Sequence, residues 1–114
     1  MSVLAIDAGT TGVTALVVRA DGTVAARGYQ EFRQYYPHPG WVEHLPEDIW
    51  QATLAASRQA LGQAAGKISG GADPGPVTAL GITNQRETAV VWDRASLAAP
   101  RRASGWQDRR TARI

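Results

Sequence analysis

Short apolar runs alternate with turn-forming residues over the first third of the chain, a pattern typical of consecutive strands. Residues 2–7 form one apolar run, and Gly12–Arg19 form a second that is rich in Val, Leu and Thr. Asp21-Gly22 is a tight-turn signal, and a third extended run follows over residues 23–34. This spacing predicts an antiparallel meander of three strands.

One helix is expected over Pro46–Ala65. Proline suits the first helical position, and the acidic residues of the first turn complement the positive end of the helix dipole. The cap position falls on Leu45, which has no side-chain acceptor, so a contribution of about 1 kcal/mol is missing. The face expected to lie on the sheet carries Trp50, Leu54, Leu61 and Ala64.

The remaining segments predict further strands joined by loops. Prolines make residues 35–41 irregular, and glycines and prolines make residues 66–76 a loop. Residues 77–83 predict a strand after the helix, and such a crossover pairs parallel with an earlier strand. Residues 88–93 predict another strand, and residues 104–107 a weaker extended segment. The chain is therefore expected to be one α/β domain, with ligands at the carboxyl ends of its strands.

Composition changes this picture little. The chain has 114 residues, of which 44% are hydrophobic, and its net charge of +2 is too small to indicate nucleic-acid binding. Half of the twelve basic residues lie in the last 21 positions: Arg94, Arg101, Arg102, Arg109, Arg110 and Arg113. A solvated arginine-rich surface is the simpler interpretation, and a small nucleic-acid binder is the alternative.

The sequence also bears on the cellular location of the protein. It contains no cysteine, which excludes disulfides and thiolate chemistry. No apolar run in it has the length of a signal-peptide core or a membrane span. We therefore expect a cytoplasmic protein with no membrane span.

The segment Asp7-Ala8-Gly9-Thr10-Thr11-Gly12 carries the first candidate chemistry. Backbone N–H groups bunched in such a turn form an anion-binding concavity, and glycines let a phosphate approach the main chain. Asp7 is suited to a hydrated Mg²⁺, which proteins hold through one or two carboxylates plus substrate phosphates. The segment predicts half of a nucleotide-phosphate site, with an ordinary hairpin as the alternative.

Two further polar clusters follow later in the chain. In Thr83-Asn84-Gln85-Arg86-Glu87-Thr88, Arg86 donates and Glu87 accepts hydrogen bonds, which suits a polyol; the alternative is a solvated loop with an ion pair. In Trp106-Gln107-Asp108-Arg109-Arg110, the indole is suited to pack on the C–H face of a sugar. The alternative there is a basic corner with a half-buried tryptophan.

With these clusters, the chain resembles the FGGY carbohydrate kinases, and within that family the glycerol kinases. The resemblance rests on the three clusters together with Tyr36-Pro37-His38-Pro39-Gly40-Trp41-Val42-Glu43-His44 and Val91-Trp92-Asp93-Arg94, all in the family's order. It implies a ribonuclease H-like (actin-like ATPase) α/β fold that is incomplete. Residues 1–114 would be the N-terminal part of the first kinase domain, with the second domain absent.

The resemblance implies transfer of the γ-phosphoryl group of ATP to glycerol, giving glycerol 3-phosphate; another polyol or sugar is the alternative substrate. Asp7 would serve the Mg²⁺ shell, and Arg86 and Glu87 would hold glycerol hydroxyls beside a wall formed by Trp106. The nucleotide phosphates would lie against Gly9, Thr10, Thr11, Gly12 and Thr14.

The resemblance assigns no catalytic residue to this chain, because the family's Asp base lies farther along the polypeptide. We therefore expect the isolated chain to be inactive, with the remainder of a kinase as its partner in cis or trans. The full-length protein is expected to be a homo-oligomer that binds neither nucleic acid nor membrane. The alternative is a stand-alone binding or assembly module of the same fold without catalysis.

Four departures from the family pattern bear on these expectations. Ala8 stands where the family usually has Gln or a comparable polar residue, and Thr14 stands where it has Arg. Loss of that Arg removes a charge-assisted phosphate contact, worth roughly 1.5–3 kcal/mol if fully engaged. Leu45 replaces a frequent Asp before the helix, and Ser104-Gly105 replace apolar residues, which weakens the expected last strand.

Overall fold

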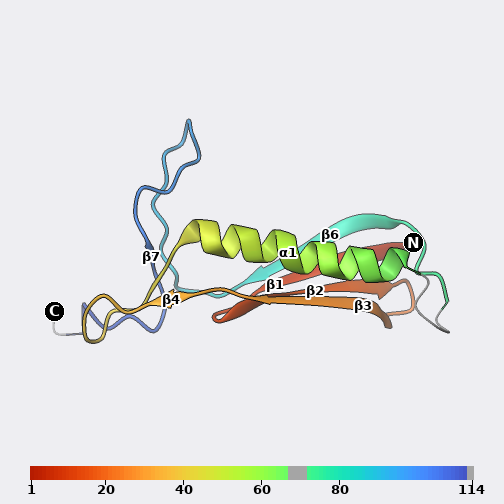
Figure 1. Cartoon of the computed structure of the whole chain (residues 1–114), viewed down its shortest axis with the longest axis horizontal. Coiled ribbons are helices and arrows are strands. Elements are labelled where there is room, and N and C mark those ends of the chain that lie inside the picture. The colour runs from red at the N-terminus through yellow and green to blue at the C-terminus, as the bar shows by residue number, and fades with distance from the viewer. Residues whose placement is uncertain (67–71, 113–114) are drawn as a thin grey trace.

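The main sheet has four strands in the order β3-β2-β1-β6 and one helix on its face (Figure 1). Its strands are β1 (Ser2–Ala8), β2 (Gly12–Arg19), β3 (Val24–Glu31) and β6 (Val77–Asn84). The first three form the predicted antiparallel meander, and β6 pairs parallel with β1, as the crossover predicted. This computed structural model describes residues 1–66 and 72–112.

A smaller antiparallel sheet joins segments far apart in the sequence. Its order is β4-β5-β7, with β4 (Gln34–Tyr35), β5 (Glu43–His44) and β7 (Ala103–Ser104). The third apolar run was expected to be one strand to Gln34, but it breaks at the buried Phe32, and the chain then enters this second sheet. Two-residue strands have no periodicity that a sequence pattern can show.

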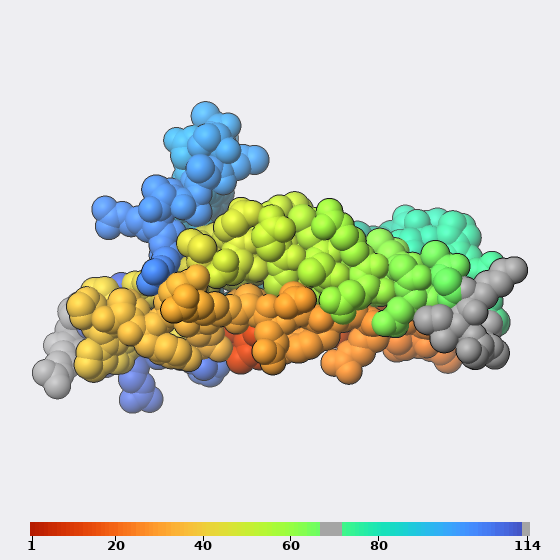
Figure 2. All heavy atoms as spheres, viewed as in Figure 1, coloured from red at the N-terminus to blue at the C-terminus, as the bar shows by residue number. Residues whose placement is uncertain are grey.

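Two strand predictions in the second half are wrong. Residues 88–93 make only one isolated bridge, between Ala89 and Ser104. The extended segment expected over 104–107 ends at Ser104, because the Asp108 N–H donates to the Gly105 carbonyl and turns the chain. Between β6 and β7 the chain leaves the sheet as a projecting loop (Figures 1 and 2), in which Val91 is 67% exposed. The predicted loop over 66–76 lies partly outside the described residues.

The helix α1 (Pro46–Ala65) has the predicted bounds, and its Leu45 cap makes no side-chain hydrogen bond, as expected. The predicted sheet-facing stripe is wrong in two of its four members, because Trp50 is 54% and Leu61 39% exposed. Leu54 and Ala64 are half-buried. The buried face is instead made of small residues: Ala52, Ala56 and Ala60.

Small residues face each other where α1 crosses β3. A Cβ on Gly28 would overlap the Ala56 carbonyl oxygen and lie 2.8 Å from Cβ of Gln59. The Gln59 amide oxygen in turn accepts the Tyr29 N–H at 3.1 Å, which satisfies a donor on the edge strand. Because the helix and the strand approach so closely, alanines form the buried face of α1. The large side chains Trp50 and Leu61 lie exposed outside this interface.

We expect Gly28→Ala to lower the free energy of unfolding by about 2 kcal/mol, because overpacking forces the helix away from the sheet. Gly62→Ala is the matched control, since nothing lies within 4 Å of its Cβ position. It should raise stability by about 1 kcal/mol through helix propensity. Urea unfolding followed by circular dichroism measures both, and equal effects of the two variants would contradict this packing.

Candidate functional site

The carboxyl ends of β1 and β6 bring the first two predicted clusters together. Asp7 and Ala8 pair with Thr83 and Asn84 in the parallel register. The Gln85 N–H extends this pairing by donating to the Ala8 carbonyl at 3.0 Å. The glycine-threonine turn after β1 therefore lies beside the Arg86-Glu87 segment after β6, at the edge where α/β sheets hold their ligands.

The turn between β1 and β2 is narrow and tied to its neighbours. The Gly9 N–H donates to the Gly12 carbonyl at 3.0 Å, and the Phe32 N–H donates to the Thr11 carbonyl at 3.2 Å. A Cβ on Gly12 would lie 2.6 Å from the Tyr29 hydroxyl. Only glycine fits at this position. The fold itself therefore requires Gly12, and the missing side chain also leaves room for an anion to approach the turn.

Tyr29 is a residue of this site that the sequence reasoning did not single out. It pairs with Thr14 across β2 and β3, and its hydroxyl covers Gly12. The predicted meander places β2 and β3 side by side. The register that brings the Tyr29 side chain to the turn also depends on an irregularity in the pairing between Val17 and Val18. A phenol hydroxyl can donate to an anion.

Asp7 is the carboxylate nearest the turn in sequence. Alternate residues of β1 face α1, and Asp7 lies on the opposite face with its antiparallel partner Thr14. Among residues 1–66 and 72–112, no three metal-ligating side chains gather. A single exposed carboxylate fits Mg²⁺, which keeps several waters and takes further ligands from substrate phosphates.

Arg86 and Glu87 are exposed, and within the described part of the chain neither takes part in an ion pair. The alternative of a solvated loop with an ion pair therefore holds for the exposure of the two residues but not for the ion pair. Glu87 has φ of +60°, a left-handed conformation that costs about 1 kcal/mol. The buried side-chain oxygens of Gln85 and Thr88 have no hydrogen-bond partner among the described residues. Strain and unsatisfied polar atoms thus gather in this segment.

Trp106 joins the third cluster to the first. Its indole Nε1–H donates to Oγ1 of Thr10 at 3.0 Å, while the ring stays 51% exposed. The structure thus brings the turn, the Arg86-Glu87 segment and Trp106 to one end of the sheet.

Asp108 anchors the segment that carries Trp106. Its carboxylate accepts the Val42 N–H at 2.8 Å and two guanidinium N–H groups of Arg110 at 2.8 and 2.7 Å. Arg110 also reaches Glu43 at 2.9 Å and lies over the Trp41 ring. The Arg110 guanidinium holds the pKa of the Asp108 carboxyl well below its usual range.

Gly105, one of the departures from the family pattern, has a packing role. Its N–H donates to the Val42 carbonyl at 2.9 Å. A Cβ there would lie 3.0 Å from Nε2 of His44, which is fully buried against Phe32. Burial lowers the pKa of His44, which favours the neutral imidazole.

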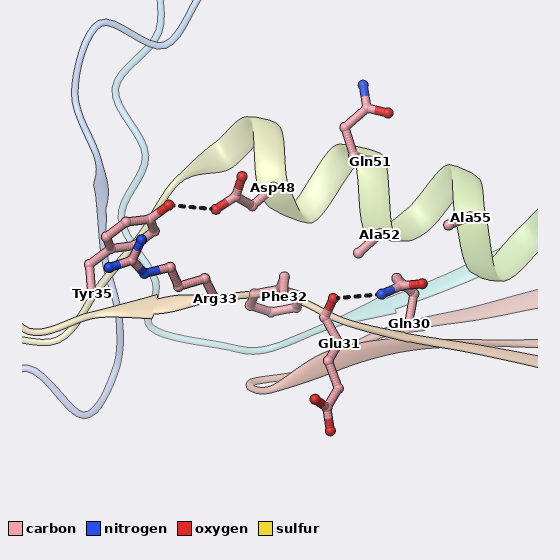
Figure 3. A pocket seen from close by; sticks show the side chains of 9 residues that line it. All are labelled: Gln30, Glu31, Phe32, Arg33, Tyr35, Asp48, Gln51, Ala52 and Ala55. Carbon is pink, nitrogen blue, oxygen red and sulfur yellow. Dashed lines mark hydrogen bonds between the residues drawn. The ribbon is translucent and has the colours of Figure 1, made fainter.

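A shallow cleft of about 540 Å³ lies elsewhere, between α1 and the ends of β3 and β4 (Figure 3). Arg33 lies against the Tyr35 ring there, and the Tyr35 hydroxyl donates to Asp48 at 2.8 Å, which raises the pKa of Tyr35. None of the predicted site residues lines this cleft. The candidate site is therefore the open edge at the strand ends.

Two of the clustered arginines have structural partners. Arg102 lies over the Tyr35 ring and within 3.8 Å of Glu43, and Arg110 is bound to Asp108 and Glu43. Arg113 lies outside the described residues. In the part of the chain that the structure covers, no helix combines the length and apolarity that crossing a bilayer requires.

Residues 2–114 match the N-terminal domain of the FGGY family of carbohydrate kinases. The chain belongs to this family. It is 55% identical over 112 residues to a glycerol kinase of Nitrobacter hamburgensis and 54% identical to one of Bradyrhizobium diazoefficiens. Each match covers 98% of this chain and 21% of the relative, so the chain spans about a fifth of the length of these relatives.

Solved structures of the family have the same fold as this chain. A Plasmodium falciparum glycerol kinase with ADP superposes with a TM-score of 0.85 at 26% identity, covering 96% of this chain and 21% of that one. A xylulose kinase from Rhodospirillum rubrum gives 0.83 at 26% identity, covering 96% and 22%. The predicted actin-like α/β fold, present here as an incomplete domain, is confirmed.

We expect low pH to weaken the Asp108–Arg110 pair, which holds the segment that carries Trp106. Because the pKa of Asp108 is lower in the folded chain than its ordinary value of 3.8, its stabilising contribution is complete above that value. The contribution is lost as the pH falls below it. Between about pH 6 and about pH 3, the wild type should therefore lose more stability than Asp108→Asn in urea unfolding.

The matched control for this experiment is Glu31→Gln, which neutralises an exposed carboxylate. It should keep the acid sensitivity of the wild type. Parallel pH profiles for the wild type and Asp108→Asn would show that the Arg110 pair does not stabilise this segment.

Proposed function

We propose that this chain supplies the phosphate-binding and polyol-binding part of a glycerol kinase-type active site, as the first part of the first kinase domain. One observation carries the proposal. The turn after β1, the Arg86-Glu87 segment after β6 and Trp106 all meet at one end of the sheet. The family and the 55% identity to a glycerol kinase favour glycerol over a sugar.

The residues divide into two neighbouring groups. Asp7 would join the shell of Mg²⁺, while the hydroxyls of the turn would face the phosphates of ATP. The Gly9 N–H donates to the Gly12 carbonyl, so the two glycines would contribute mainly by letting a phosphate approach closely. Bound ATP supplies the γ-phosphoryl group. Positioning and charge stabilisation account for most of the catalysis of phosphoryl transfer, and a preformed turn is suited to both.

The nucleotide contacts that we propose are made by Gly9, Thr10, Thr11, Gly12 and Thr14. Thr14 is the cross-strand partner of Asp7, so the two side chains lie on the same face of the sheet. Arg86 and Glu87 would bind the polyol hydroxyls by donating and accepting respectively, and Trp106 would pack on its C–H face.

Proton removal from the attacking hydroxyl would need a group from outside this chain. We assign Asp7 to the metal shell, and both carboxylate oxygens of Asp108 are bound to Arg110. The remainder of a kinase, in cis or in trans, would therefore contribute the base, and the isolated chain would not transfer phosphate. ATP and Mg²⁺ would come from the cytoplasm.

A chimera tests this proposal. In the Nitrobacter hamburgensis glycerol kinase, the segment that matches this chain at 55% identity is exchanged for residues 1–114. We expect glycerol-dependent ADP formation from Mg·ATP. Arg86→Ala and Glu87→Ala in the chimera should each lower kcat/KM for glycerol about 10- to 100-fold, since a hydrogen bond to a charged group is worth about 1.5–3 kcal/mol.

Arg58→Ala is the control, because it removes an exposed arginine from α1, outside the site. A folded chimera without glycerol-dependent turnover would contradict the proposal. Glycerol-dependent ATP consumption by the isolated 114-residue chain, above that of its Glu87→Ala variant, would contradict the claim that the base lies outside it.

A specific observation also favours the second candidate, an assembly module. β6 is an edge strand of eight residues without a charged side chain. Leu80 and Ile82 pair with Leu4 and Ile6, so they lie on the helix-bearing face, yet they are 58% and 68% exposed. Long uncharged edges pair with further strands. We propose that the isolated chain associates with a second copy along this edge.

Light scattering on a size-exclusion column measures this association. We expect the wild-type chain to elute as a dimer or larger species. Ile82→Lys should shift it toward the monomer, because a charged side chain on an edge strand opposes pairing with a second strand. Trp92→Lys, at a site 58% exposed on the projecting loop, is the control and should leave the mass unchanged. A stable wild-type monomer would contradict association.

A further inference from the structure

The hydrogen bond between Thr10 and Trp106 joins two side chains that are 96 positions apart. The donor is the indole Nε1–H and the acceptor is Oγ1, at 3.0 Å. Thr10 belongs to the turn that we propose to hold phosphate, and Trp106 to the wall of the proposed polyol pocket. A single hydroxyl therefore connects two ligand positions.

A threonine hydroxyl has one proton to donate and two lone pairs with which to accept. At Thr10 one lone pair receives the indole N–H, while the hydroxyl proton donates to no group in residues 1–66 and 72–112. That proton is available to an anion at the turn. When a hydroxyl donates, its oxygen becomes a better acceptor, because hydrogen bonds in a chain polarise one another.

We propose that Thr10 is a positioning residue that couples phosphate binding to the orientation of Trp106. An anion that accepts the Thr10 hydroxyl proton strengthens the bond from the indole to Oγ1, and so fixes the ring at the polyol position. This inference rests on the proposed phosphate site. It adds that an anion bound at the turn fixes the orientation of Trp106, at the proposed polyol position, through the side chain of Thr10.

The neighbouring threonine offers a matched comparison. Thr11 lies in the same turn and contacts Phe32 through its backbone carbonyl, and its hydroxyl has no bond to Trp106. Thr10→Val removes the acceptor at nearly constant volume, and Thr10→Ser restores it. In the absence of a ligand, Thr11→Val should leave the solvent exchange rate of the Trp106 indole proton unchanged.

The first measurement needs no ligand. In ¹⁵N-labelled full chain, four indole N–H resonances are expected, and Trp106→Phe identifies the one of interest. Thr10→Val should increase the solvent exchange rate of this indole proton about five-fold, the factor that corresponds to about 1 kcal/mol. Thr10→Ser should keep the wild-type rate. Backbone amide spectra that match the wild type show that each variant is folded.

The second measurement adds inorganic pyrophosphate as the probe. In the wild type we expect the Gly9 and Gly12 amide resonances to shift, and the Trp106 indole proton to move downfield with the same saturation curve. In Thr10→Val the amide resonances of the turn, Gly9 and Gly12, should still shift, while the resonance of the Trp106 indole proton should not move.

The outcomes separate this inference from the proposed function. Loop shifts without any indole shift in the wild type overturn the coupling and leave the phosphate site standing. An indole shift that persists in Thr10→Val also overturns it. No loop shift at all contradicts both the coupling and the proposed phosphate site in this chain; the exchange rates then decide alone whether Thr10 positions Trp106.

Discussion

The parallel pairing of β1 with β6 is the constraint on which the rest of the structure depends. It links two segments that are separated by the meander and the helix, and it is extended by the bond from the Gln85 N–H to the Ala8 carbonyl. A crossover that returns a strand beside the first one aligns their carboxyl ends. The proposed phosphate turn and the proposed polyol segment become neighbours through backbone register, before any side chain contributes.

Side chains outside the set of predicted site residues hold the candidate site together. Asp108 and Arg110 fix the segment around Trp106 with charge-assisted hydrogen bonds, which are stronger than neutral ones. The Arg86-Glu87 segment is different, because Glu87 has a left-handed backbone and Gln85 and Thr88 leave buried oxygens unsatisfied. Strain and unpaired polar groups of this kind persist where the surrounding structure imposes them, and they are typical of binding sites.

Sequence patterns predicted the elements that are long and periodic. The meander, the bounds of α1 and the parallel crossover strand follow from apolar spacing, glycines and Pro46, and the structure confirms them. The helix face was wrong because the close approach at Gly28 favours alanines over Trp50 and Leu61. The 88–93 strand was wrong because an apolar run alone does not provide a partner strand. Tyr29 and the Thr10–Trp106 bond are tertiary features, so no local pattern could show them; the roles of the site residues remain predictions.

The central proposal is that a phosphate and metal position at the turn after β1 lies beside a polyol position formed by the Arg86-Glu87 segment and Trp106. Paramagnetic broadening by Mn²⁺, used in place of Mg²⁺ with pyrophosphate, tests it directly, because the effect falls steeply with distance from the ion. The account predicts that the resonances of Gly9, Gly12, Arg86 and the Trp106 indole broaden together, and that Asp7→Asn abolishes this. Broadening that centres on another carboxylate, or that survives in Asp7→Asn, would contradict the account.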